Sequence, residues 1–73
     1  MKANLEFNLP EEGQEFQDAC DGTKWKCLVW QFDQHMRKEV KYNDKLSDEV
    51  HNAIADLRKL LYEMLNEEGL LLD

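Results

Sequence analysis

The chain has 73 residues and carries 16 acidic against 9 basic side chains, a formal net charge of −7 at pH 7. The hydrophobic core of a single domain of this size contributes only about 3–5 kcal/mol to the stability of the fold. We therefore expect one small domain whose copies associate into homo-oligomers. The 42% hydrophobic content excludes a disordered tail. The acidic balance argues against binding of duplex nucleic acid, because phosphate contacts need a positive field.

The first residues lack the charged and apolar regions of a signal peptide, and the longest apolar run is the four residues Cys27 to Trp30. A membrane-spanning helix needs about 20 apolar residues, so we expect no contact with a membrane. We expect a cytoplasmic protein. In that compartment Cys20 and Cys27 are expected to be free thiols.

The N-terminal segment, residues 1–9, alternates apolar and polar side chains, which is the pattern of a half-buried strand. A lone strand leaves its backbone groups unpaired. We therefore expect it either to pair with Leu70 to Leu72 or with another copy of the chain, or to remain an extended arm.

Three helices are predicted after this segment, over residues 10–21, 23–43 and 47–68. Pro10 suits a first helical turn, and Asp21 with Gly22 is read as the end of the first helix. Ser47 is predicted to cap the third helix and Gly69 to end it in a left-handed conformation. The predicted fold is mainly α, one small domain over residues 1–73: an antiparallel helical hairpin with a short N-terminal helix and a strand or arm.

Both long helices show the apolar spacing of one buried face. In the helix of residues 23–43 this face comprises Trp25, Leu28, Val29, Phe32, Met36 and Val40. In the helix of residues 47–68 it comprises Val50, Ile54, Leu57, Leu61, Met64 and Leu65. We expect these two faces to pack together as the core.

Positive charge is concentrated in the middle of the chain. Residues 23–45 carry six basic against three acidic side chains, whereas the segments on either side are each at −5. Trp30 points nearly opposite the predicted buried face, at roughly 100° per residue. A basic and polar group surrounds it, consisting of Lys26, Gln34, Arg37 and Lys41. We predict that these five residues, the Trp30 surface, form a binding site. The alternatives are that acidic helices neutralise the cations, or that the N-terminal arm or another subunit covers Trp30.

Metal binding and catalysis find little support in the sequence. Cys20, Cys27, His35 and His51 are separated by six, seven and fifteen residues in the chain, unlike the close ligand pairs of structural zinc sites. No phosphate-binding loop or catalytic motif is present, and the single serine is the predicted cap. We expect no enzymatic activity, no metal and no cofactor.

Three stretches of the chain, "FNLPEE", "DGTKWKCLVWQFDQHMRKEVKYNDKLSDE" and "LYEMLNEEGLLLD", together resemble a group of small bacteriophage proteins of about this length. The resemblance covers nearly the whole chain and carries no assigned catalytic or ligand residues. It implies synthesis in the host cytoplasm and stoichiometric binding to a host protein or to a component of anti-phage defence.

Together these observations predict a non-enzymatic phage-type accessory protein that binds a host or defence protein through the Trp30 surface. An oligomeric sponge is the first alternative, in which Trp30 stacks a nucleotide base and cations of neighbouring subunits hold its phosphates. The second is an acidic DNA mimic that presents carboxylates to a basic groove. The candidate carboxylates are those of Glu11, Glu12, Glu15, Asp18, Glu63, Glu67 and Glu68.

Overall fold

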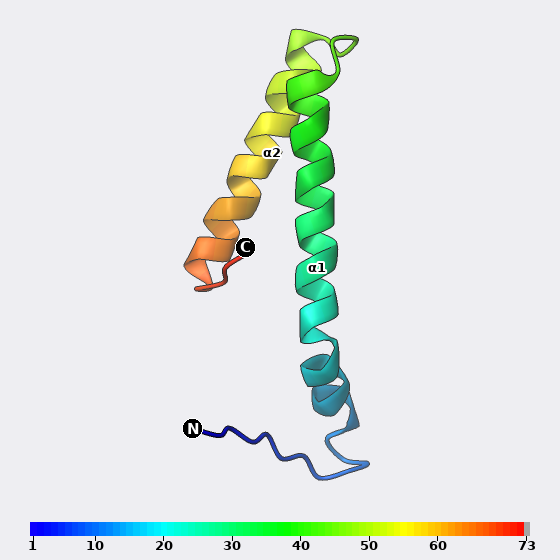
Figure 1. The fold of residues 1–73 in the computed structure, drawn as a ribbon, viewed down its shortest axis with the longest axis vertical. Helices are drawn as coiled ribbons and strands as arrows, with labels where there is room; N and C mark the ends of the chain where they lie inside the picture. Colours follow the sequence, from blue (N-terminus) through cyan, green and yellow to red (C-terminus); the bar gives the residue numbers. More distant parts are fainter. Residues whose placement is uncertain (73) are drawn as a thin grey trace.

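Two helices form an antiparallel hairpin in the computed structural model, which describes residues 1–72 (Figure 1). Helix α1 spans Gly13–Tyr42 and helix α2 spans Asp48–Glu67. The mainly α fold and the hairpin predicted from the sequence are therefore present. Neither helix is at once long enough and apolar enough to cross a membrane.

The predicted break between a first and a second helix was wrong, because α1 runs without interruption from Gly13 through Gly22 to Tyr42. A glycine inside a helix costs only about 1 kcal/mol relative to alanine, which a long helix tolerates. Asp21 also acts within the helix: it accepts a hydrogen bond from Gln17 and pairs with Lys24. These local contacts continue the helix across the segment that resembled a stop.

Of the two alternatives predicted for the N-terminal segment, a strand or an extended arm, the strand is not present in residues 1–72. Residues 1–8 form an extended arm, the other alternative, and residues 9–12 form a turn that precedes α1. The arm runs away from the hairpin at the free end of α1 (Figure 1). Its one aromatic contact is local, with the rings of Phe7 and Phe16 edge to face at 5.8 Å.

The turn between the helices is held by side chains at both of its ends. Asn43 donates to Glu39 at 2.7 Å, and its side-chain oxygen accepts the backbone N–H of Lys45. Ser47 caps α2 by accepting the backbone N–H of Val50, as the sequence predicted. His51 donates through Nε2 to the carbonyl of Asn43 at 3.0 Å. These bonds connect the two helix ends across five residues.

Helix α2 ends at the predicted glycine. Gly69 has φ +68°, and the N–H of Leu70 reaches back to the carbonyl of Leu65 at 2.9 Å. A left-handed residue followed by a hydrogen bond back to the last turn of the helix is the pattern of a C-terminal cap. The cap turns the last residues back toward α1, where the helices diverge (Figure 1). Leu72 fills part of that space and is only 6% exposed.

The hairpin leaves most of its apolar surface in contact with solvent. Leu72 is the one buried apolar side chain of residues 1–72, and the accessible surface of the chain is 6673 Å². A compact protein of 8.7 kDa exposes about 4,700 Å². The radius of gyration is 17.3 Å, against about 11 Å for a compact chain of this length. The single chain is therefore elongated and lacks a closed core.

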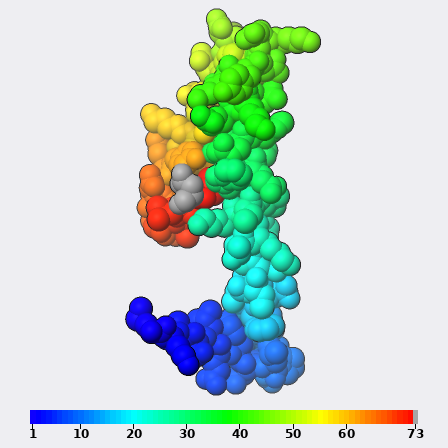
Figure 2. Space-filling model, in the orientation of Figure 1, coloured from blue at the N-terminus to red at the C-terminus, as the bar shows by residue number. Residues whose placement is uncertain are grey.

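The difference in helix length explains part of this shape. Helix α1 has 30 residues and α2 has 20, so about 15 Å of α1 extends beyond the end of α2. Figure 2 shows this first part of α1 standing alone between the hairpin and the N-terminal arm. Phe16, in that part of α1, is 41% exposed.

Replacement of two glycines by alanine tests the fold, because one substitution is expected to stabilise the protein and the other to destabilise it. Gly22→Ala is expected to stabilise the protein by about 0.5–1 kcal/mol, because the position is helical and an added Cβ meets no atom within 4 Å. Gly69→Ala is expected to destabilise it by about 1–2 kcal/mol, because φ is +68° there. Thermal unfolding followed by circular dichroism measures both variants. Destabilisation by Gly22→Ala would show that α1 is interrupted.

Candidate functional site

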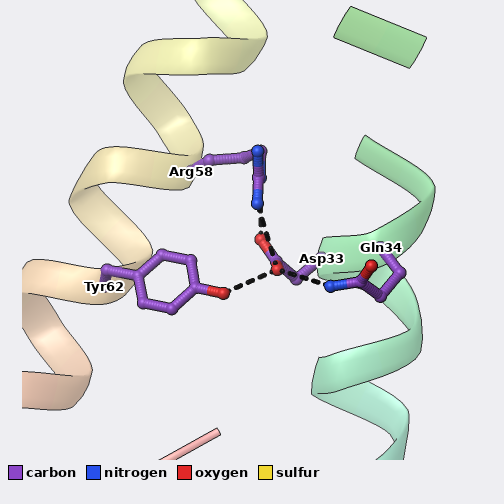
Figure 3. A network of polar contacts seen from close by, with 4 residues as sticks. All are labelled: Asp33, Gln34, Arg58 and Tyr62. Atoms are coloured by element: carbon purple, nitrogen blue, oxygen red, sulfur yellow. Dashed lines mark hydrogen bonds and ion pairs between the residues drawn. The ribbon is translucent and has the colours of Figure 1, made fainter. Parts of the chain in front are cut away.

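The side chain of Asp33 lies at the contact between the helices and is completely buried. Arg58 of α2 binds the carboxylate side-on through two hydrogen bonds: Nε donates to Oδ1 at 2.8 Å, and Nη2 donates to Oδ2 at 3.2 Å. The hydroxyl of Tyr62 donates to Oδ2 at 2.7 Å. Figure 3 shows the two α2 side chains converging on the carboxylate. We call these three residues the Asp33 cluster.

The Asp33 cluster was not predicted from the sequence, although the sequence contains a signal for it. Asp33 is one helical turn after Val29, and Arg58 and Tyr62 are four residues apart on α2, in line with partly buried Ile54 and Leu65. Charged side chains so close to an apolar face require a partner when that face is buried. The pairing joins residues 25 and 29 positions apart in the chain, so local pattern alone does not reveal it.

The cluster changes the proton affinity of each member. The hydrogen bond from Arg58 lowers the pKa of Asp33, and the Tyr62 hydrogen bond and a weaker Coulombic effect of Arg37 act in the same direction against the opposing effect of burial. The hydrogen bond to Asp33 raises the pKa of Arg58 and, together with burial, that of Tyr62. At neutral pH the carboxylate is therefore ionised and both of its donors keep their protons.

The Asp33 cluster determines which side of α1 faces α2. Asp33 lies about 60° around the helix from Trp30 and about 100° from Phe32. The apolar face of α1 that was predicted to be buried is consequently divided into a covered part and an exposed part. Val29, Met36 and Val40 are partly covered, whereas Trp25, Leu28 and Phe32 are 58–62% exposed. On α2, Leu57 and Met64 are likewise exposed, at 59% and 57%.

The exposed halves of the two apolar faces border one groove on the surface of the hairpin. It is lined by Leu28, Val29, Phe32, Met36, Leu57 and Leu61, all of them apolar. We call these six residues the apolar groove. The expectation that the two apolar faces form a closed core within one chain was wrong, because contact along the Asp33 side leaves this flank open.

The predicted Trp30 surface lies on the other flank of α1. The Trp30 side chain is 43% exposed, and it borders a shallow hollow together with Lys26, Thr23, Cys27, Gln31 and the C-terminal Leu72. Lys26, Arg37 and Lys41 are exposed, and none forms an ion pair with an acidic side chain of residues 1–72. The acidic helix α2 therefore does not pair with these three cations.

Gln34 occupies a different position from the other four predicted residues. It is half-buried, and its amide Nε2 donates to Asp33 Oδ2 at 3.4 Å (Figure 3). Lys26 shares the hollow with Trp30, whereas Arg37 and Lys41 continue the stripe toward the turn between the helices. From Lys26 to Lys41 the stripe is about 22 Å long, at 1.5 Å per helical residue.

Residues 1–72 contain no group of three or more side chains placed to hold a metal ion. Cys20 and Cys27 are exposed free thiols on α1. His51 is engaged in the turn, and the ring of His35 lies 3.9 Å from Glu39 of the same helix. The apolar groove and the Trp30 surface are two separate candidate surfaces for recognition in this part of the chain.

Comparisons of the chain with protein-family models, with curated proteins and with solved structures found no match. The side chains described above are therefore the basis of the proposed function. Two features carry it: the unpaired cations around a half-exposed indole, and an apolar groove on the opposite flank of the same helix.

Removal of the Arg58 guanidinium tests the energetic role of the Asp33 cluster. Arg58→Met leaves a completely buried carboxylate with Tyr62 and Gln34 as its remaining donors, so we expect a loss of about 3 kcal/mol in the free energy of unfolding. Asp33→Leu combined with Arg58→Met removes both charges and is expected to recover most of that loss. Denaturant unfolding at one protein concentration compares the variants. Equal losses in the single and the double variant would show that the buried carboxylate carries no penalty.

The same cluster predicts a dependence of stability on pH. Because the folded pKa of Asp33 lies below its unfolded value of about 4, its contribution is present above that pH and is lost as the pH falls through the folded pKa. The difference in melting temperature between wild type and Arg58→Met should therefore be largest at neutral pH and narrow below about pH 4. A constant difference down to acid pH would contradict the assignment.

Proposed function

We propose that the protein is a non-enzymatic binding protein that acts stoichiometrically on a protein partner through the Trp30 surface. The observation that carries the proposal is the half-exposed Trp30 ring beside Lys26, with Arg37 and Lys41 farther along the same stripe and unpaired within residues 1–72. Tryptophan and arginine are the side chains most enriched among residues that dominate binding energy at protein interfaces. The partner surface that fits this stripe is acidic, with an apolar depression for the indole ring.

The length of the stripe favours a protein over a nucleotide as the ligand. Of its three cations, only Lys26 borders the hollow next to Trp30. Arg37 lies about 10 Å and Lys41 about 16 Å farther along the helix axis than Trp30. One chain cannot direct all three cations to the phosphates of one nucleotide, whereas a protein interface of ordinary size covers such a distance.

The class of partner follows from the resemblance to small phage proteins. Proteins of that kind act in the host cytoplasm on host or defence components, so an acidic surface on such a component is the proposed target. A cytoplasmic site of action is part of the same proposal. An interface of this type gains association rate from opposite charges and specificity from the aromatic contact.

Recovery of a partner from host lysate, followed by measurement of its dissociation constant, tests the proposal. Trp30→Ala with Arg37→Ala is expected to raise that constant about 30-fold or more, because loss of a dominant interface residue costs at least about 2 kcal/mol. The matched control is Tyr42→Ala with Lys45→Ala, which removes another exposed aromatic and another cation near the turn. Added salt should weaken binding of the wild type.

An equal loss of affinity in the Trp30 and Tyr42 variants would assign binding to general charge rather than to the Trp30 surface. Full affinity in the Trp30 variant would place the binding site elsewhere on the molecule. Circular dichroism of both variants verifies that the helices persist, since Trp30 and Tyr42 are substantially exposed in the hairpin.

A further inference from the structure

The apolar groove is an interaction surface that lies apart from the Trp30 surface. Its most exposed members, Leu28, Phe32 and Leu57, have 58–61% of their surface in contact with solvent. Around α1, Leu28 and Phe32 each lie about 160° from Trp30. A molecule bound in the groove would therefore leave the Trp30 surface accessible on the opposite flank.

The amount of exposed surface indicates how large the missing contact is. The chain exposes 6673 Å², about 2,000 Å² more than a compact protein of its mass. A stable interface buries about 800 Å² on each partner. The excess is larger than the area that one such interface buries on this chain. The remaining exposed area is attributed to the arm and the free end of α1.

We propose that the apolar groove is covered by the same groove of a second copy, which forms a two-fold symmetric dimer with a four-helix core. Each groove contains side chains from both helices, so a two-fold rotation can place α1 of one copy against α2 of the other. The Leu28 and Phe32 side chains of each copy then pack against Leu57 and Leu61 of its partner. The core absent from the single hairpin is completed in this way.

Charge favours the pairing of unlike helices. Helix α1 carries five basic and five acidic side chains and is neutral, whereas α2 carries two basic against five acidic side chains, a net −3. Contact between two α2 helices would bring like charges together, whereas contact of α2 with the neutral α1 of the second copy avoids this repulsion. A second copy thus supplies the apolar surface that the groove requires without placing two acidic helices together.

The dimer does not depend on the proposed function, and it has a functional consequence. Because the groove and the Trp30 surface lie on opposite flanks of α1, the dimer carries two Trp30 surfaces on its outside. Two equivalent sites on one particle increase the apparent affinity for a target that presents two or more acidic surfaces. Loss of the dimer would leave each Trp30 surface intact.

Sedimentation equilibrium of the full chain, over a concentration series reaching about 0.5 mM, tests the proposal. The expected mass is about 17 kDa, twice the 8.7 kDa of one chain. The double variant Phe32→Asp with Leu57→Asp is expected to have half this mass. The matched control, Leu5→Asp with Tyr42→Asp, adds the same charges at two exposed positions outside the groove and should keep the dimer mass.

A wild-type mass of one chain, or of any number of chains other than two, overturns the proposal. So does an unchanged mass of the Phe32 and Leu57 variant. If that variant loses its helical circular dichroism signal, the photo-crosslinking residue benzoylphenylalanine at position 32 decides instead. Crosslinked dimers are expected from position 32 and not from position 42, and their absence at position 32 overturns the proposal.

Discussion

The carboxylate of Asp33 is shielded from solvent and is held by two side chains of α2, and this contact constrains how the two helices face each other. An ionised group at such a position requires its partners, because an unpaired buried charge costs several kcal/mol. Rotation of α1 to bury Leu28 and Phe32 would withdraw Asp33 from Arg58. A polar interaction thus determines the packing of the hairpin, and the apolar side chains occupy the positions that remain.

This constraint divides the surface of α1 into two flanks with different chemistry. Trp30 and the unpaired cations lie on one side of the contact with α2, and the apolar groove lies on the other. Toward the end of α2 the two helices diverge, and the C-terminal residues run back toward α1 (Figure 1). Leu72 is buried there, beside residues of both helices. Because the flanks are separate, the two proposed roles of α1, self-association through the groove and recognition of a partner through the Trp30 surface, do not compete for the same side chains.

Features governed by local contacts could be predicted from the sequence. The Ser47 cap, the left-handed Gly69 and the extent of α2 depend on hydrogen bonds between residues close together in the chain. The predicted break at Gly22 was wrong because a glycine inside a helix costs only about 1 kcal/mol relative to alanine, and the residues on either side of it keep the helix intact. The buried face of α1 was misassigned because the pairing of Asp33 with Arg58 joins residues 25 positions apart. Helical spacing predicted which residues share a face of α1 with Trp30, but it did not predict that Gln34 is half-buried and donates to the neighbouring Asp33.

The most direct test of this account is a nuclear magnetic resonance measurement of the side-chain contacts of Asp33 in the folded protein. The account predicts close contacts from the Asp33 side chain to the guanidinium of Arg58 and the ring of Tyr62. It also predicts slow solvent exchange of the Arg58 Nε proton, which donates to the buried carboxylate at 2.8 Å. Rapid exchange of that proton, together with contacts from α2 to Leu28 and Phe32 of the same chain in place of Asp33, would contradict it.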